Sequence, residues 1–231
     1  MLDGEHGSGV AMSMRLVVRL AEVMQAKRLI EVSGAHIDSC LYHGQSGLDF
    51  VERLVAAEAM VVVPTTLNVS SLDLLHPELV LSDPAEVAAS TALMDGYVAL
   101  GCEPTWTCAP YQRSVRPGLG DQIAWAESNA IVFANSVLGA RTHRYGDFID
   151  IAAAVTGRVP DAGLHRTENR RATVIVDVSG LPRDMVTSDA VYPCLGYVIG
   201  RRHPGQIPAI VGLPPTATED NLKALGAAAA V

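Results

Sequence analysis

The sequence predicts an α/β fold with a largely parallel sheet. Segments whose apolar residues recur at helical spacing alternate with short apolar runs that fit buried strands. Hydrophobic residues make up 49% of the 231 residues, which is enough for a substantial core. Ligands of such sheets bind in the loops that follow the carboxyl ends of the strands, so we expect the functional site there.

Five helices are expected from apolar periodicity. Residues 82–101 have the clearest start, in which Ser82 or Asp83 caps the helix and a proline and a glutamate follow in its first turn. The segment 46–59 has Ser46 as its cap, and the segment 11–28 ends in basic residues, as helix C-termini favour. The helices are expected at 11–28, 46–59, 82–101, 146–157 (ending at a glycine) and 216–230 (capped).

Five short apolar runs predict the strands. They are 29–34 (LIEVSG), 60–65 (MVVVPT), 130–136 (AIVFANS), 172–180 (ATVIVDVSG) and 207–213 (IPAIVGL). The loops at 33–44, 64–73, 103–111 and 135–147 are rich in His, Cys, Asn, Ser, Thr and Arg, which a chain that only had to fold would not need. This clustering predicts an active site. No internal repeat and no clear domain boundary is visible.

Composition excludes several classes of function. The net charge of −8 disfavours nucleic acid and anionic membranes as partners. No run is long enough to span a membrane, the N-terminus does not resemble a secretory signal, and four cysteines are too few for a disulfide scaffold, so a reducing cytoplasm is expected. The chain has no G-x-S-x-G, Walker or G-x-G-x-x-G motif, which argues against acyl transfer, nucleotide hydrolysis and Rossmann-type hydride transfer.

The cysteines and histidines offer both functional and structural interpretations. Cys108 lies in a polar loop and favours a functional role, whereas Cys102 and Cys194 have apolar neighbours and are expected in the core. The run HIDSCLYHG places His36, Asp38, Cys40 and His43 within eight residues, where they form either one ion or substrate site or a histidine network near a turn. Arg144 and Asp147 either serve the site or form an ion pair with each other.

Long stretches of the chain resemble the catalytic, large-subunit portion of the aconitase X family. They are SGAHIDSCLYHG, VPTTLNVSSLDLLHP, GCEPTWTCAPY, GDQIAWAESNAIVFANSVLGARTHRYGDF, GLHRTENRRA and GLPPTATEDNLKALGAA, in this order. The resemblance implies a cytoplasmic hydro-lyase of the aconitase superfamily with a three-layer α/β domain. It also implies an iron–sulfur cluster held by three cysteines, and a swivel domain or small subunit that supplies a serine base.

The resemblance assigns roles to particular residues. Cys108 is the expected cluster ligand, and Cys40 is the second candidate ligand. Candidates for contact with a small hydroxy acid substrate are Ser33, His36, Thr66, Asn68, Asn135, Ser136 and Arg141. A swivel domain is not expected in this chain, so no catalytic base is assigned.

The family pattern extends beyond this sequence. Residues 1–231 are therefore expected to form an incomplete aconitase X catalytic domain, in which another cluster cysteine is missing. Cis-3-hydroxy-L-proline is the favoured substrate because no obvious phosphate cradle is visible, and mevalonate 5-phosphate is the alternative. Two further hypotheses are a non-catalytic remnant or structural partner, and an enzyme with a single metal on His36, His43 and Cys108.

Overall fold

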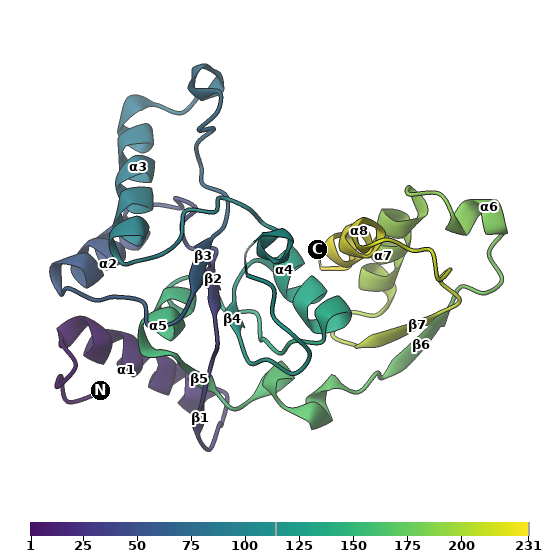
Figure 1. The fold of residues 1–231 in the computed structure, drawn as a ribbon, viewed down its shortest axis with the longest axis horizontal. Helices are drawn as coiled ribbons and strands as arrows, with labels where there is room; N and C mark the ends of the chain where they lie inside the picture. Colours follow the sequence, from purple (N-terminus) through teal and green to yellow (C-terminus); the bar gives the residue numbers. More distant parts are fainter. Residues whose placement is uncertain (114, 231) are drawn as a thin grey trace.

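The computed structural model describes residues 1–113 and 115–230 and confirms the α/β class (Figure 1). The strands are β1 (Leu29–Glu31), β2 (Ala35–Ile37), β3 (Thr65–Leu67), β4 (Ala124–Trp125), β5 (Arg158–Pro160), β6 (Val174–Asp177) and β7 (Pro208–Val211). The α-helices are α1 (Ser8–Val23), α2 (Gln45–Ala56), α3 (Pro84–Ala99), α4 (Ser128–Phe133), α5 (Ile149–Thr156), α6 (Arg183–Val186), α7 (Val191–Arg202) and α8 (Glu219–Ala229). No helix in the described residues is long and apolar enough to cross a membrane.

The strands are divided among small sheets, most of whose pairings are parallel as predicted. The central sheet has the order β3-β2-β4, with His36 of β2 opposite Thr66 on one side and Trp125 on the other. Strands β6 and β7 form a second parallel pair, and β1 and β5 pair antiparallel. The carboxyl ends of β2, β3 and β4 therefore lie at one edge, where the loops after them meet.

The strongest helix predictions are confirmed by their capping groups. Asp83 caps α3 by accepting hydrogen bonds from the amides of Ala85 and Glu86, both at 2.9 Å. Thr218 caps α8 in a reciprocal capping box with Asn221. Helix α5 ends at Gly157, whose φ of 63° is the left-handed conformation that glycine adopts without steric cost.

Two helix ends differ from the prediction. Gly44, and not Ser46, is the N-cap of α2, because the helix begins one residue before Ser46. Helix α1 ends at Val23, so the basic residues Lys27 and Arg28 lie beyond it. Arg28 instead pairs with Asp161 across 2.8 Å.

Three of the strand predictions need correction. The run 130–136 is not a strand: it forms α4 and enters the π-helix Ala134–Leu138, because the Glu127 carboxylate caps a helix start there. The run 60–65 is irregular up to Pro64, and β3 begins only at Thr65. The run 29–34 forms β1, which pairs with β5, while the neighbouring residues 35–37 form the central strand β2.

The core lies on both faces of the central sheet. One face packs Ile37, Leu67 and Val51 with α2, α3 and α5, and Cys40 and Cys102 are buried in the same cluster. On the other face, Trp125 belongs to a cluster with Tyr111 and Phe133, whose rings stack at 3.9 Å between centroids. The prediction that Cys102 is a core thiol is confirmed.

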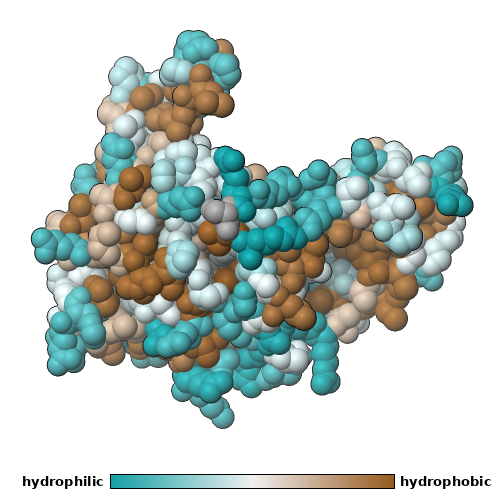
Figure 2. Space-filling model, in the orientation of Figure 1, coloured by the Kyte–Doolittle hydropathy of each residue, from teal (hydrophilic) through white to brown (hydrophobic). Residues whose placement is uncertain are grey.

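Residues 172–230 form a lobe at the right of Figure 1, built from β6, β7 and α6–α8. Helix α7 was not predicted. Cys194 on this helix is exposed, which corrects the expectation of a core thiol. The buried face of α7 is formed by Tyr192, Gly196 and Ile199. A groove of about 620 Å³ runs between this lobe and α4, lined among others by Val132, Ile199 and Leu222. Figure 2 shows apolar surface in this region.

Candidate functional site

A row of three side chains crosses the central sheet on the face toward Tyr111. His36 lies between Thr66 and Trp125: its Nδ1 is 2.8 Å from Thr66 Oγ1, and its ring meets the Trp125 ring edge-on at 5.9 Å between centroids. His36 is completely buried, and burial lowers its pKa to about 3. The imidazole is therefore neutral near pH 7, and its Nε2 has no hydrogen-bond partner among the described residues.

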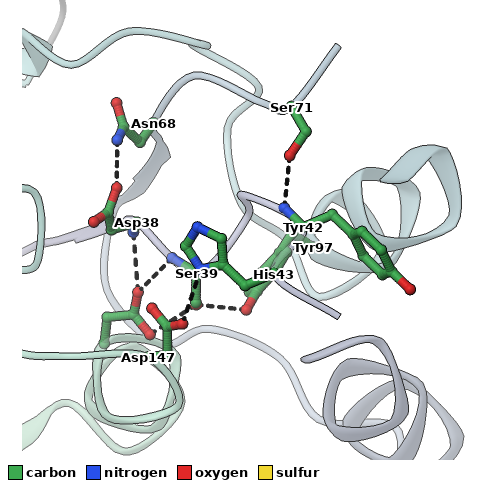
Figure 3. A network of polar contacts seen from close by, with 9 residues as sticks. Asp38, Ser39, Tyr42, His43, Asn68, Ser71, Tyr97 and Asp147 are labelled. Atoms are coloured by element: carbon green, nitrogen blue, oxygen red, sulfur yellow. Dashed lines mark hydrogen bonds and ion pairs between the residues drawn. The ribbon is translucent and has the colours of Figure 1, made fainter. Parts of the chain in front are cut away.

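The carboxyl ends of β2 and β3 bring Asp38 and Asn68 together. The Asn68 amide Nδ2 donates to Asp38 Oδ1 at 2.5 Å (Figure 3). The Asn68 main-chain amide donates to the Ile37 carbonyl at 2.9 Å. Asn68 is buried, yet its Oδ1 has no partner in the part of the chain that the structure describes. Asp38 is half-buried, so this pair faces the loop region at the edge of the sheet.

The segment after α3 carries Cys108 to the same edge. It runs parallel to β3, with the Leu67 amide donating to Glu103 at 3.1 Å and the Thr107 amide donating to Leu67 at 3.3 Å. Trp106, between them, has a φ of 44°, a left-handed conformation that is strained for a residue with a side chain and is found preferentially at functional sites. Cys108 follows and is half-buried, the position of a thiol that a ligand can reach.

Tyr111, Glu127 and Asn129 lie next to Cys108. Burial raises the pKa of the Tyr111 hydroxyl, the side chain of Asn129 lowers it, and the nearby carboxylate of Glu127 raises it, so these groups lie near one another. The Glu127 carboxylate accepts from the main-chain amides of Asn129 at 3.0 Å and Ala130 at 2.6 Å, so the start of α4 fixes its orientation.

Several buried polar atoms at this edge lack partners among the described residues. They are His36 Nε2, Asn68 Oδ1, Trp125 Nε1, Asn129 Oδ1 and the Tyr111 hydroxyl. Buried polar groups are almost always hydrogen-bonded, and leaving one unsatisfied costs about 1–3 kcal/mol. Because donors and acceptors gather at one edge, the arrangement suits a small polar molecule. We call these residues, together with Asp38, Thr66 and Cys108, the candidate site.

The structure unites some of the predicted substrate residues and separates others. His36, Thr66 and Asn68 belong to the candidate site. Ser33 precedes β2 at the opposite edge of the sheet, where its amide and hydroxyl both donate to the Gln122 carbonyl. Arg141 lies at that same amino edge and donates to the His165 carbonyl at 3.0 Å and to Thr167 at 2.9 Å.

Asn135 and Ser136 lie on the π-helix and line the groove beside the second lobe. The Asn135 amide donates to the carbonyls of Ile131 and Thr142, and its Oδ1 accepts from Arg170. These hydrogen bonds hold the π-helix in place, which is a structural use of the side chain. Ser136 is exposed.

Cys40 is placed unfavourably for a metal ligand. Its thiol is buried, and its single S–H lies within hydrogen-bonding distance of the carbonyls of Ile37, Asn68 and Val69. Burial, with the negative charges of Asp150 and Asp38, raises its pKa. The structure thus places Cys40 in the core, and its role as a second cluster ligand stays a prediction.

The mononuclear metal site on His36, His43 and Cys108 is not formed. His43 is exposed and lies 3.5 Å from the carboxylate of Asp147 (Figure 3). The sequence allowed an ion pair between Asp147 and Arg144, whereas the structure places the Asp147 carboxylate beside His43. Within residues 1–113 and 115–230, no three His, Cys, Asp or Glu side chains are close enough to hold a metal. These residues consequently do not make a complete cluster site.

Local sequence patterns indicate three residues of this region only weakly: Tyr111, Trp125 and Asp150. Tyr111 and Trp125 were overlooked because aromatic residues in apolar runs usually mark only a core. Asp150, which holds the loop after β2, is flanked by Ile149 and Ile151. An acidic residue inside an apolar helix is the one signal that could have indicated it.

The fold and the site define a class: an α/β protein whose small parallel sheet presents neutral polar groups and one accessible thiol at its carboxyl edge. A family model described as "Aconitase X first domain" matches residues 1–168, and one described as "Aconitase X second domain" matches residues 172–231. The chain therefore belongs to the aconitase X family.

Individual relatives agree with this assignment. Cis-3-hydroxy-L-proline dehydratase from Pseudomonas aeruginosa is 47% identical over 99% of this chain and 39% of its own length. The phosphomevalonate dehydratase large subunit from Thermococcus kodakarensis is 39% identical over 99% of this chain and 56% of its own length. The crystal structure of holo-form aconitase X from Thermococcus kodakaraensis matches with a TM-score of 0.88 at 38% identity, covering 99% of this chain and 56% of that one. The chain thus spans about two fifths to three fifths of the lengths of these relatives.

Proposed function

We propose that this chain is part of a hydro-lyase that removes water from a small hydroxy acid, with cis-3-hydroxy-L-proline as the substrate. The observation that carries the proposal is the cluster of unpartnered buried polar atoms around His36 and Asn68 at the carboxyl edge of the sheet. The 47% identity to a cis-3-hydroxy-L-proline dehydratase supports this substrate. Dehydration takes the proton from the carbon beside the carboxylate and hydroxide from the next carbon, so that a double bond forms and one water leaves.

The residues of the candidate site have separable tasks in this proposal. Neutral His36 and the carbonyl oxygen of Asn68 bind and orient the substrate through the groups that lack partners. The stacked rings of Trp125, Tyr111 and Phe133 exclude water from one side. No base is assigned among these residues, and the family resemblance places a serine base on a swivel domain or small subunit, which we propose as a partner.

Cys108 is proposed to contribute one ligand of an iron–sulfur cluster. Cys108 is half-buried at the candidate site. Cys40 is buried, and Cys194 is exposed on the second lobe. The remaining ligands would come from outside the described residues. When bound, an iron with an open coordination position supplies a Lewis acid for the departing hydroxide.

The test measures iron and acid-labile sulfide after anaerobic reconstitution of the chain together with the segment or subunit that supplies the remaining ligands. We expect Cys108→Ser to lose both, and Cys194→Ser, the matched change at an exposed thiol, to retain the wild-type content. Iron without sulfide would contradict the cluster and indicate a mononuclear iron site. If the wild type binds neither in that assembly, Cys108 is not a cluster ligand and a non-catalytic role of this chain gains support.

The alternative substrate is mevalonate 5-phosphate, favoured by the 39% identity to a phosphomevalonate dehydratase large subunit. Both compounds should be supplied side by side to the reconstituted protein, with loss of one water followed by mass spectrometry. Dehydration of cis-3-hydroxy-L-proline alone is the expected result. Reaction of the phosphorylated compound alone would overturn the choice of substrate while leaving the reaction class intact.

A further inference from the structure

Asp150 is a completely buried acid that the proposed chemistry does not use. It lies in the first turn of α5, and four donors converge on its carboxylate. Oδ2 accepts from the main-chain amides of Asp38 and Ser39, both at 3.0 Å. Oδ1 accepts from the Ser39 hydroxyl at 2.9 Å and from the amide of Ile151 at 2.7 Å.

These bonds hold the loop that follows β2, residues 38–44, which we call the β2 loop. Three of the four donors belong to Asp38 and Ser39, more than a hundred residues earlier in the chain. In Figure 3 the network around Ser39 lies directly beside Asp38, whose carboxylate accepts from Asn68. The orientation of Asp38 in the candidate site thus depends on a carboxylate that is itself out of reach of a ligand.

The surroundings fix Asp150 from both sides. Phe148, at the start of α5, has a φ of 70°, and its ring packs edge-on against Phe50 of α2 at 4.9 Å between centroids. Strain of this kind persists only where the surrounding structure enforces it. From α3, the Tyr97 hydroxyl lies 2.5 Å from Ser39 Oγ, and since Ser39 donates to Asp150, Tyr97 donates to Ser39.

Burial and hydrogen bonding oppose each other at this carboxyl group. Burial raises the pKa of Asp150 and the bonds from Ser39, Ile151 and Asp38 lower it, and burial prevails, so that the pKa is about 7. The carboxylate uses both oxygens as acceptors, which the charged form does best. An amide in its place would turn a donor toward amides that also donate.

We propose that Asp150 is a positioning residue that fixes the β2 loop and, through it, Asp38 in the candidate site. One part of this proposal rests on the proposed function, namely that Asp38 lies beside the substrate. Its effect on the β2 loop is independent of any reaction.

The test compares wild-type protein with Asp150→Asn and with Asp95→Asn, the same change at an exposed position on α3. We expect the amides of Asp38 and Ser39 to exchange with deuterium at least about tenfold faster in Asp150→Asn, because hydrogen bonds to a charged acceptor are lost. Asp95→Asn should match the wild type.

Thiol labelling of the native protein supplies the second readout. Cys40 lies in the β2 loop, whereas Cys102 is equally buried and its pKa is also raised by Asp150, so it controls for the change in charge. We expect faster labelling at Cys40 than in the wild type and a much smaller change at Cys102. Equal acceleration at both thiols would reveal general destabilisation and overturn the positioning role.

Ser39→Ala is the milder variant for the case in which Asp150→Asn does not fold. It removes one of the four donors and should accelerate labelling of Cys40 to a smaller extent. Unchanged exchange and labelling in these variants would refute the inference whatever the chain catalyses. Loss of loop order with no dehydratase activity in the wild type would leave it standing and count only against the proposed function.

Discussion

At the scale of single residues, burial decides the charge of His36. Its ring is enclosed by the sheet, and the lowering of its pKa to about 3 exceeds the opposite effect of hydrogen bonding to Thr66. Nδ1 of the neutral ring is bonded to Thr66, so Nε2 is the nitrogen left to bind a hydroxyl or an amine of a ligand.

The same shift predicts a pH dependence of stability. The pKa of His36 is lower in the folded protein than in the unfolded chain, so the unfolded chain takes up the proton first as the pH falls below about 6.5. Between pH 7 and pH 5, His36 alone should reduce the free energy of unfolding by about 2 kcal/mol. The measurement is urea denaturation at both pH values.

Other buried groups contribute, and a variant separates them. His165, with a pKa lowered to about 4, acts in the same direction, and Asp150, with a pKa raised to about 7, acts in the opposite one. The loss between pH 7 and pH 5 should be smaller by about 2 kcal/mol in His36→Gln, and unaltered in His76→Gln at an exposed position. An identical loss in wild type and His36→Gln would show that His36 is protonated in the fold.

At the scale of helices and strands, predictions succeeded where the signal was local. Asp83 caps α3 through amides two and three residues away, so the sequence alone contains the whole interaction. The apolar run 130–136 was wrongly read as a strand, because apolar residues without clear alternation fit a buried helix equally well. The deciding group was the carboxylate of Glu127, immediately before the run.

The candidate site was predictable in part for the same reason. The loops after the predicted strands 29–34 and 60–65 contain His36 and Asn68, as the rule that ligands bind at carboxyl ends predicts, whereas Cys108 lies in the loop after the helix predicted at 82–101. Strands of three residues bring the residues of both edges close together in sequence, so Ser33 was assigned to the edge opposite the one it occupies. Asp150 depends on partners 111 and 112 residues away, which no local pattern encodes.

The pairing of α7 and α8 gives a prediction at this scale. A Cβ on Gly196 would lie 2.1 Å from the Leu225 carbonyl oxygen, a main-chain atom that cannot turn aside. Gly196→Ala should therefore lower the free energy of unfolding by about 1–3 kcal/mol. Gly47→Ala in α2 is the matched control: its Cβ meets nothing within 4 Å, so the lost flexibility of the unfolded chain should raise stability by about 0.5–1 kcal/mol.

Chemical denaturation of both variants measures the two changes. Opposite signs are expected because the same substitution meets main chain at one position and open space at the other. Equal effects of the two substitutions would mean that α7 and α8 do not approach as closely as the structure places them.

At the scale of the whole molecule, the second lobe is attached next to the loop that carries Cys108. The Arg116 guanidinium donates to both carboxylate oxygens of Glu219, at 3.2 and 2.5 Å, and Gln112 donates to Asp220 at 3.2 Å. Both acids lie in the first turn of α8, a helix that packs on α7 and on α4. The lobe and the Cys108 loop should consequently loosen together.

Reversing the charges of Arg116 and Glu219 tests this attachment. Arg116→Glu places a third carboxylate beside Glu219 and Asp220, so we expect deuterium exchange of the α8 amides to rise about two- to fivefold, in keeping with the 0.2–1 kcal/mol typical of exposed pairs. The double variant Arg116→Glu/Glu219→Arg should recover much of the protection, and Arg19→Glu, which breaks an exposed pair within α1, should leave α8 unchanged. The labelling rate of Cys108 is expected to follow the α8 amides across the series, because the helix and the thiol are joined through the same loop. A variant in which α8 loosens while Cys108 keeps its wild-type rate would separate the lobe from the candidate site.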